Sequence, residues 1–424
     1  MKIAIIGTGI AGNVAAWHLC REHDVSVFEA NDYVGGHTHT HTIPWQDEQY
    51  TVDTGFIVFN YKTYPHFTQL LRELDVAVQP SAMSFSVKCE KTGLEYNGTS
   101  LNSLFAQRRN LLRPRFYRML RDILRFNREA PGLLDQPDSA LSLGEFLYRG
   151  GYSEQFIEHY LVPMGAAIWS ADPLQMYRIP AQFFIRFFHN HGMLSVDERP
   201  QWYVIQGGSQ SYVKKLTAPF AHRIRTRTPI ESVTRFPDHV SVKPRGQAAE
   251  RFDAVFFATH SDQALRLLRD PSPEEQRILG AIPYQANEAV LHTDSSVLPQ
   301  RQLAWAAWNY HILPRQQDRV ALSYNMNILQ SIRAPVQFCV TLNNTRAIDP
   351  TKILKRLTYH HPVFSPAAVA AQAGQRRING VNRTYYCGAY WRFGFHEDGV
   401  VSALDALQHF KEQQHAQLSL RRAS

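Results

Sequence analysis

The chain begins with Lys2-Ile-Ala-Ile-Ile-Gly-Thr-Gly-Ile-Ala-Gly12, an apolar stretch that leads into three glycines with the spacing Gly-x-Gly-x-x-Gly. This pattern predicts a strand, a tight turn at Gly7, a close backbone approach to a ligand at Gly9, and a helix that packs near the strand at Gly12. The start of that helix presents unpaired N–H groups and a positive dipole end, which suit a pyrophosphate. A second apolar strand ends on Glu29, whose carboxylate is placed to accept hydrogen bonds from a ribose diol. Together these features predict a dinucleotide site.

Two segments that follow, Asn31-Asp-Tyr-Val-Gly-Gly-His37 and Val52-Asp-Thr-Gly-Phe56, indicate which dinucleotide binds. They resemble the amine oxidase superfamily of flavoproteins, which includes monoamine and polyamine oxidases, protoporphyrinogen oxidase and carotenoid desaturases. Further segments resemble the family in the same order along the chain: Val204–Leu216, Pro229–Val233, Phe252–Thr259 and Tyr385–Gly399. The sequence is most similar to a bacterial branch of predicted NAD/FAD-binding oxidoreductases, some of whose relatives are associated with enzymes that modify membrane acyl chains.

The resemblance implies FAD as the cofactor and an α/β fold. We expect a Rossmann-type FAD-binding domain made of residues 1–85, 201–280 and 381–424, interleaved with a discontinuous α+β substrate domain made of residues 86–200 and 281–380. A chain of 424 residues has the length for two such domains.

The resemblance also implies the site residues. The positions expected to bind the cofactor are Gly7, Gly9, Ile10, Ala11, Gly12, Glu29, Ala30, Gly36, His37, Thr38, Gly55, Phe56, Ile230, Thr259, Gly388, Asp398, Gly399 and Val400. A helix is expected to begin at Asp398-Gly399, with Asp398 as its N-cap, and to run to about Gln413, pointing its N-terminus at the flavin. The catalytic candidates are His396 and Glu397, which come just before it. His396 is expected to act as proton donor or acceptor, and the alternative is a histidine fixed by local hydrogen bonds.

Three departures from the family pattern disfavour ordinary amine oxidation. His37 stands where most relatives have an arginine, Ala389-Tyr390 replaces a Thr-Glu pair, and no counterpart is found for the lysine that holds a water against the flavin in many relatives. The alternation His37-Thr-His-Thr-His41 would place three imidazoles on one strand face. No carboxylate or cysteine is spaced to complete a metal site there, so we predict none.

The charge of the chain is uneven. Lysine and arginine number 45 against 37 acidic residues, for a net charge of +8. Eight arginines interleave with apolar residues between Arg108 and Arg128, and from Arg115 onward they recur at helical spacing, at Arg118, Arg121 and Arg125. Two interpretations remain: a solvated face on a helix that packs against its own domain, or contact with an anionic membrane surface. Nucleic acid is not expected, because no binding motif accompanies the charge.

Other features bear on location and substrate. We find no basic leader, no apolar run of about eighteen residues and no Cys-x-x-Cys pair, so we expect a cytoplasmic protein, peripheral on the inner face of the membrane if the arginines bind lipid. Phe183, Phe184, Phe187 and Phe188 fall at helical spacing, either as core or as the wall of a tunnel for an acyl chain.

The sequence therefore predicts an FAD-dependent oxidoreductase that removes hydride from an apolar, fatty acyl or lipid substrate. The first alternative is a flavin oxidase of amines or polycyclic substrates. An alternative of another class is a non-catalytic lipid-binding protein of the same fold, like the Rab escort and GDP dissociation inhibitor relatives.

Overall fold

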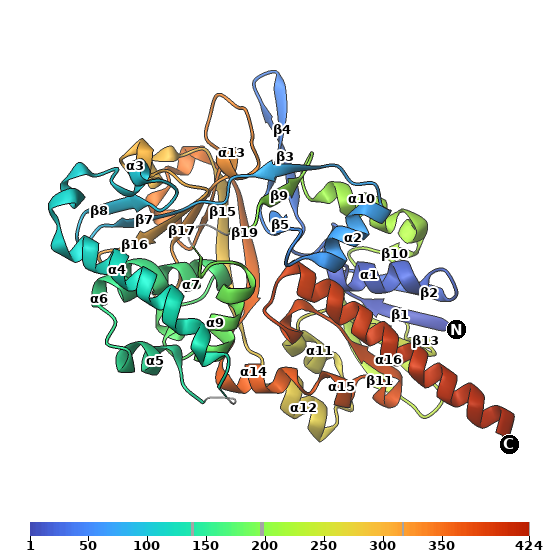
Figure 1. Cartoon of the computed structure of the whole chain (residues 1–424). Helices are drawn as coiled ribbons and strands as arrows, with labels where there is room; N and C mark the ends of the chain where they lie inside the picture. The colour runs from blue at the N-terminus through green and yellow to red at the C-terminus, as the bar shows by residue number, and fades with distance from the viewer. Residues whose placement is uncertain (137–139, 196–198, 316–317, 424) are drawn as a thin grey trace.

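A five-stranded parallel sheet carries the glycine motif in the computed structural model, which describes residues 1–136, 140–195, 199–315 and 318–423 (Figure 1). The strands follow the order β10-β2-β1-β14-β20. Their bounds are β10 Ile224–Arg225, β2 Asp24–Phe28, β1 Lys2–Ile6, β14 Ala254–Phe257 and β20 Thr384–Tyr386. Ile5 of β1 pairs with Val27 on one side and Phe256 on the other, and all three are fully buried. This order and this parallel pairing confirm the predicted Rossmann-type unit.

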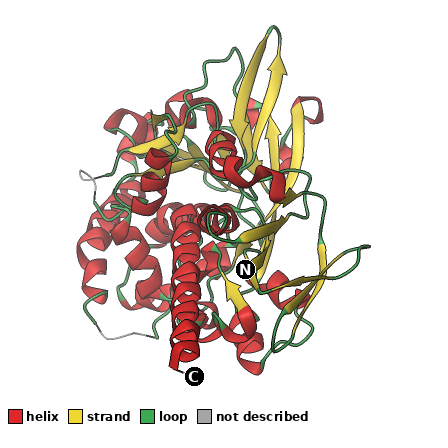
Figure 2. Ribbon diagram, turned by 90° about the vertical axis from the view of Figure 1, so that its right-hand side faces the viewer, coloured by secondary structure: helices red, strands yellow, loops and turns green. Residues whose placement is uncertain are grey.

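Helices cover the parallel sheet and begin close to its carboxyl edge. α1 (Ile10–Leu19) follows the glycine turn, and Gly12 lets it lie against the strand end, because a Cβ there would come within 2.0 Å of the Gly7 carbonyl oxygen. α16 (His396–Ala423) packs against α1 and α2 (Pro65–Glu73) and extends along the outside of the molecule (Figures 1 and 2). The helix predicted from Asp398-Gly399 to about Gln413 is therefore shorter than α16 at both ends. The other helices of this half are α10 Gln210–Thr217, α11 Ser261–Leu267, α12 Pro273–Leu279, α14 Pro366–Gln372 and α15 Gln375–Ile378.

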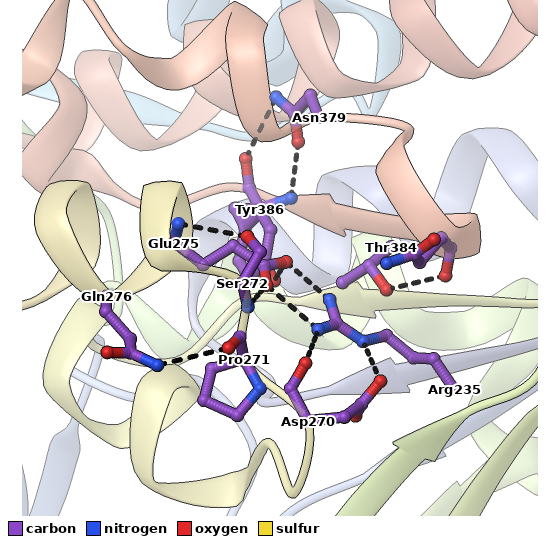
Figure 3. Close-up of polar contacts among 10 residues, drawn as sticks. Arg235, Asp270, Pro271, Ser272, Glu275, Gln276, Asn379, Thr384 and Tyr386 are labelled. Carbon is purple, nitrogen blue, oxygen red and sulfur yellow. Dashed lines mark hydrogen bonds and ion pairs between the residues drawn. The ribbon is translucent and has the colours of Figure 1, made fainter.

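A buried ion pair joins an antiparallel meander to α12 and, through Tyr386, to the parallel sheet (Figure 3). The meander consists of β11 Ile230–Arg235, β12 Val240–Pro244 and β13 Glu250–Phe252. The guanidinium of Arg235 donates to both carboxylate oxygens of Glu275 on α12, and to the side chain and carbonyl of Asp270. Tyr386 of β20 donates its hydroxyl to Glu275 at 2.5 Å. Because the Arg235 and Glu275 side chains are both 1% exposed, this network joins three elements through groups that water does not reach.

A mixed seven-stranded sheet forms the second half of the molecule, in the order β19-β15-β18-β17-β16-β7-β8. Its strands are β19 Ile353–Pro362, β15 Tyr284–His292, β18 Cys339–Leu342, β17 Leu322–Asn325, β16 Trp308–Ile312, β7 Phe85–Cys89 and β8 Leu94–Asn97. Two small sheets lie between the halves: the hairpin β3 (Thr40–Trp45) with β4 (Glu48–Asp53), and β5 (Val58–Asn60) with β9 (Trp202–Ile205) and β6 (Val78–Ser81). The domain limits given above stay a prediction.

A helical layer packs on the seven-stranded sheet (Figure 1). Its members are α3 Leu101–Leu104, the 3-10 turn η1 Arg108–Leu112, α4 Pro114–Glu129, α5 Leu143–Arg149, α6 Glu154–Phe156, the π turn η3 Ile157–Leu161, α7 Val162–Trp169, α8 Pro173–Met176 and α9 Ala181–Asn190, and α13 Met326–Leu329 lies in the sheet region. The four phenylalanines of α9 are at most 9% exposed and belong to the core. Phe184 and Phe188 stack on each other, while Phe183 and Phe187 pack on Phe393. No helix in the described ranges combines the length and apolar character needed to cross a bilayer.

Candidate flavin and active site

The glycine turn leaves one open position, at Gly9. An ideal Cβ built on Gly9 meets nothing within 4 Å, whereas a Cβ on Gly7 would lie 2.7 Å from the Ala258 carbonyl oxygen. Gly7 also has φ +104°, which disfavours any side chain. The predicted position Thr259 lies beside this turn, since its Cγ2 would be 3.5 Å from that Gly7 Cβ. Gly9 is therefore the glycine that keeps space free for a ligand, next to the N-terminal N–H groups of Ile10 and Ala11.

Glu29 is buried at the end of β2, as predicted. One oxygen accepts hydrogen bonds from the Thr8 backbone N–H at 3.0 Å and the Thr8 hydroxyl at 2.5 Å, and the other accepts from the Asn31 N–H at 2.8 Å. The oxygen that accepts only from Asn31 keeps a second lone pair for a ribose hydroxyl. The Thr228 N–H donates to the Glu29 carbonyl, which sets the start of β11 and Ile230 beside this end of the sheet. Ala30 follows Glu29 and is exposed.

The segment Gly36–Thr38 folds over the glycine turn and against Gly55. A Cβ on Gly36 would lie 2.9 Å from the Gly9 Cα, and a Cβ on Gly55 would lie 2.0 Å from the His37 carbonyl oxygen. That carbonyl accepts from the Phe56 N–H at 2.8 Å. The His37 Nε2 is buried without a hydrogen-bond partner among the described residues. Burial lowers the pKa of His37 to about 4, so the ring that replaces the family's arginine is neutral at pH 7.

His396 lies in an aromatic and hydrogen-bonded enclosure. Its ring stacks on Phe56 with centroids 3.7 Å apart, and its Nε2 is 2.6 Å from the Tyr212 hydroxyl. Tyr212 is in turn 2.8 Å from the Thr38 hydroxyl. Burial holds the pKa of His396 well below its ordinary value. The structure thus brings together three predicted residues, His396, Phe56 and Thr38, and adds Tyr212 of α10, which sequence reasoning passed over although it lies in a segment recognised as family-like.

Glu397 and Asp398 hold backbone groups. The two Glu397 oxygens accept from the N–H groups of His66 and Phe67, at 3.0 and 2.9 Å, and so cap the start of α2. Asp398 accepts from the Phe395 N–H at 2.9 Å. Because α16 begins at His396, Asp398 lies in its first turn, and the expectation that it is the N-cap was wrong. Burial raises the pKa of Asp398 to about 7. The catalytic role given to Glu397 stays a prediction.

The start of α16 meets the start of α1. A Cβ on Gly399 would come within 2.5 Å of the Ile10 Cγ2, and Val400 beside it is 2% exposed. Gly388, after β20, donates its N–H to the Ser402 hydroxyl of α16 at 2.8 Å. Two helix N-termini, with their positive dipole ends, therefore converge on the region of the glycine turn.

Asp53 is a further buried acid that the sequence analysis did not assign to the site. Its carboxylate accepts from the Ser209 N–H and hydroxyl, the Thr40 hydroxyl and the Gln330 amide, the last at 2.9 Å. The Asp53 N–H donates back to the Gln330 side chain at 2.9 Å. Burial raises the pKa of Asp53 to about 6, against the opposing effect of these hydrogen bonds. Gln330 comes from the region of the seven-stranded sheet, so Asp53 joins the two halves behind the site.

The alternating histidines do not share one strand face. β3 begins at Thr40, so His37 and His39 precede it. The His37 ring lies 5.4 Å from that of His361, while His39 lies 4.1 Å from His41. Among the described residues, no group of three or more His, Cys, Asp or Glu side chains is arranged to hold a metal ion.

Comparison with known proteins identifies the family. The family model of flavin-containing amine oxidoreductases matches residues 10–330. The chain belongs to this family. Its fold is similar to that of cyclohexylamine oxidase from Brevibacterium oxydans IH-35A, with a TM-score of 0.71, 15% identity and coverage of 97% of this chain and 99% of the other. No curated protein matches the sequence.

Two further solved structures are similar to this flavoenzyme. The CLA-producing fatty acid isomerase from P. acnes has a TM-score of 0.69 and 16% identity, and covers 96% of this chain and 98% of its own. Putrescine oxidase bound to putrescine has a TM-score of 0.68 and 14% identity, and covers 97% of this chain and 99% of its own. These likenesses confirm the predicted fold, and family membership confirms an FAD-dependent oxidoreductase.

The residues present fit FAD. The open space at Gly9, the buried Glu29 and the unpartnered His37 Nε2 are the features that a bound dinucleotide would engage. Gly36 and Gly55 would hold the segment that covers it, and Gly399 sets the N-terminus of α16 close to α1.

A cavity of about 510 Å³ lies beside the start of α16. Phe393 and Phe395 form part of its wall, and Lys62, His66 and Arg392 also line it, together with the remaining residues Thr63, Tyr64, Pro65, His189, Asn190, His191, Glu397, Asp398 and Val401. The site thus joins an aromatic wall to basic side chains at the N-terminal end of α16.

Proposed function

We propose that this flavoenzyme removes hydride from an apolar substrate, a fatty acyl chain or lipid. The observation that carries the proposal is the cavity at the start of α16. Behind its wall residues Phe393 and Phe395 stands the aromatic cluster of α9 and α7: Phe187 lies 5.6 Å from Phe393 and 4.9 Å from Phe395, and 4.9 Å from Trp169. An apolar chain is favoured against such a wall. Lys62, His66 and Arg392 suit the carboxylate or phosphate at the end of an acyl lipid.

The carboxylates of the cavity argue against an amine substrate. Glu397 and Asp398 both line it, and both accept hydrogen bonds from the backbone. Burial raises the pKa of both carboxyls, that of Asp398 to about 7, and so disfavours the anionic form that would pair with an ammonium group. That one solved structure of the same fold is a fatty acid isomerase supports an acyl substrate, while the amine oxidases of the same fold keep the amine or polycyclic oxidase as the alternative.

In the proposed reaction, bound FAD would supply the hydride acceptor. The N–H groups at the start of α16 stabilise negative charge that develops near this helix end. His396 is the proposed proton donor or acceptor, and Tyr212 fixes its Nε2 while Phe56 fixes its ring plane. The low pKa of His396 makes the neutral ring, able to accept a proton, the form present at pH 7. Glu397 is proposed as a second catalytic residue beside His396, and its carboxylate also holds the start of α2.

The choice between substrate classes can be tested by anaerobic titration of the purified holoenzyme. Oleic acid and dioleoyl phosphatidylglycerol in micelles would be added in one series, and putrescine and cyclohexylamine in another, while the visible flavin absorbance is followed. We expect bleaching with the lipids and none with the amines. Bleaching by an amine alone would overturn the proposal in favour of the alternative.

The four cysteines are unpaired, which supports the predicted cytoplasmic location.

A further inference from the structure

We propose that the surface made by η1 and the outer side of α4 docks on an anionic lipid bilayer. We call it the α4 surface and define it by Leu111, Leu112, Tyr117, Arg118, Arg121 and Leu124. Such docking would hold the enzyme at a membrane whatever its substrate.

Large apolar side chains are exposed along this surface. Leu112 is 88% exposed and Leu124 is 58% exposed, and Leu111 and Tyr117 are each nearly half exposed. Leu111, Leu112, Pro114, Tyr117, Arg118 and Arg121 line one shallow hollow that is open to solvent. The apolar and cationic side chains are therefore neighbours in space as well as in sequence. Clustered exposed leucines mark interaction sites more often than single ones do.

The charge of this segment has one sign. Between Tyr96 and Arg121 the sequence contains six arginines and no aspartate or glutamate. Among the described residues, neither Arg115 nor Arg118 has a carboxylate within ion-pair distance. Arg121 is 3.9 Å from Asp122, but its side chain remains 71% exposed. These guanidinium groups are free to meet phosphate oxygens.

The structure corrects the prediction for Arg125, one of the arginines that recur at helical spacing. The Nε of Arg125 lies 3.6 Å from the buried carboxylate of Asp122, and its guanidinium lies over the Tyr152 ring at 4.1 Å. Arg125 is therefore used inside the domain and does not belong to the α4 surface. Each of the two interpretations of these arginines therefore applies to a different part of the helix. Arg125 packs against its own domain, whereas Arg118 and Arg121 remain available to bind lipid phosphates.

The α4 surface is already rigid in the structure. Phe116, Met119 and Phe126, at most 4% exposed, anchor the inner side of α4 in the core. The Tyr117 hydroxyl donates to the Leu111 carbonyl at 3.0 Å and holds η1 against the first turns of α4. The exposed side chains are thus presented without a folding step, so binding would not bear the cost of ordering a helix.

A bilayer interface suits this combination of exposed leucines and arginines because it offers both an apolar phase and phosphates. Leu111, Leu112 and Leu124 would enter the acyl boundary, and the arginines would lie at the headgroups. A soluble polyanion would satisfy the arginines and leave the leucines in water. Each cationic side chain near an anionic surface contributes up to about 1 kcal/mol, which is roughly a fivefold change in partitioning.

The test is co-sedimentation of the FAD-loaded protein with vesicles of phosphatidylcholine alone or of phosphatidylcholine with phosphatidylglycerol. We expect binding to the anionic vesicles that weakens on going from about 0.1 M to 1 M salt, as the screening length falls from about 10 Å to 3 Å. Arg118→Gln with Arg121→Gln should weaken the partitioning by up to about 25-fold. Leu112→Ser should weaken it by about tenfold, the effect of withdrawing most of one leucine from the interface.

Matched controls come from exposed residues of the nucleotide-binding half. Arg245→Gln with Arg269→Gln removes the same charge from the meander and the end of α11, and Val381→Ser removes an exposed apolar side chain before β20. Both should bind vesicles like the parent, and all variants should keep the parental melting temperature and flavin spectrum. Binding by the Arg118/Arg121 variant equal to the parent overturns the proposal. So does equal binding to neutral vesicles, or parental binding by Leu112→Ser.

Discussion

Replacing Gly9 and Gly12 by alanine should separate cofactor binding from folding. The two glycines lie in the same turn, but an added methyl group meets different surroundings. At Gly12 it would come within 2.0 Å of the Gly7 carbonyl oxygen and 3.0 Å of the Ala258 Cβ. At Gly9 it meets no protein atom within 4 Å, and the backbone there, with φ −63° and ψ 177°, is ordinary for alanine.

The magnitudes follow from those contacts. Gly12→Ala must displace backbone, and overpacking of this kind costs about 1–3 kcal/mol, part of which is offset by the better helix propensity of alanine. Gly9→Ala should change the stability of the apoprotein by no more than about 1 kcal/mol, since it alters only the helix N-cap. Its methyl group would instead occupy space that the pyrophosphate needs. A penalty of about 1–3 kcal/mol there weakens FAD binding by about 5-fold to 150-fold.

The assay is a pair of measurements on apoprotein prepared from parent and variants: thermal unfolding, and titration with FAD followed by flavin fluorescence. We expect Gly9→Ala to unfold like the parent and to bind FAD weakly, and Gly12→Ala to unfold at a lower temperature. FAD binding by Gly9→Ala within about twofold of the parent would refute the assignment of the pyrophosphate to this turn. Unfolding of Gly12→Ala at the parental temperature would refute the packing argument.

Three further outcomes are expected. His396→Ala should slow flavin reduction about 100-fold to 10,000-fold in rapid mixing; a rate within about threefold of the parent, with a lower melting temperature, would make His396 structural. Glu275→Gln should cost up to about 3–5 kcal/mol in denaturant unfolding because it leaves the buried Arg235 charge paired only with Asp270, whose side chain is 38% exposed. The partly exposed Glu274→Gln on the same helix should cost under about 0.5 kcal/mol. Burial raises the pKa of Asp53 to about 6. Between about pH 4 and 6 this carboxyl therefore keeps its proton in the folded state, whereas the unfolded state releases it. The contribution of Asp53 to the free energy of unfolding should fall as pH rises through that window, by up to about 3 kcal/mol. Asp53→Asn should remove that slope from the difference between unfolding curves measured at pH 4 and pH 7, and an unchanged slope would contradict the assigned shift.

The glycines and the acid of the candidate cofactor site could be predicted from the sequence because local backbone requirements fix them. Gly7, Gly12 and Gly36 each meet another part of the chain within 3.0 Å of an added Cβ, so their identity is visible in a motif. The position of Glu29 is set by the length of β2, because Glu29 directly follows the last residue of that strand. The partners of His396 could not be predicted in this way, because Tyr212 reaches it from 184 residues away. A tyrosine on an amphipathic helix gives no signal of the hydroxyl that it will meet.

Two errors have the same origin. The sequence predicts the start of α16 two residues too late, because Asp398 is a good N-cap in isolation. In the structure the Asp398 side chain accepts from the Phe395 N–H from within the first turn. The spacing of the arginines also groups Arg125 with the exposed ones. The buried Asp122 turns it inward, and spacing alone does not report which neighbour a long side chain chooses.

The sequence by itself determined the nucleotide fold, the flavin and the family, because glycines, strand ends and the acid after β2 act through short-range geometry that a linear pattern records. Only the tertiary structure decided which buried groups meet: Arg235 with Glu275 and Tyr386, and Asp53 with Gln330. It also decided which arginines of one helix face solvent. Those outcomes depend on contacts between distant segments and on the cost of burying charge, and neither is written in the order of residues along the chain.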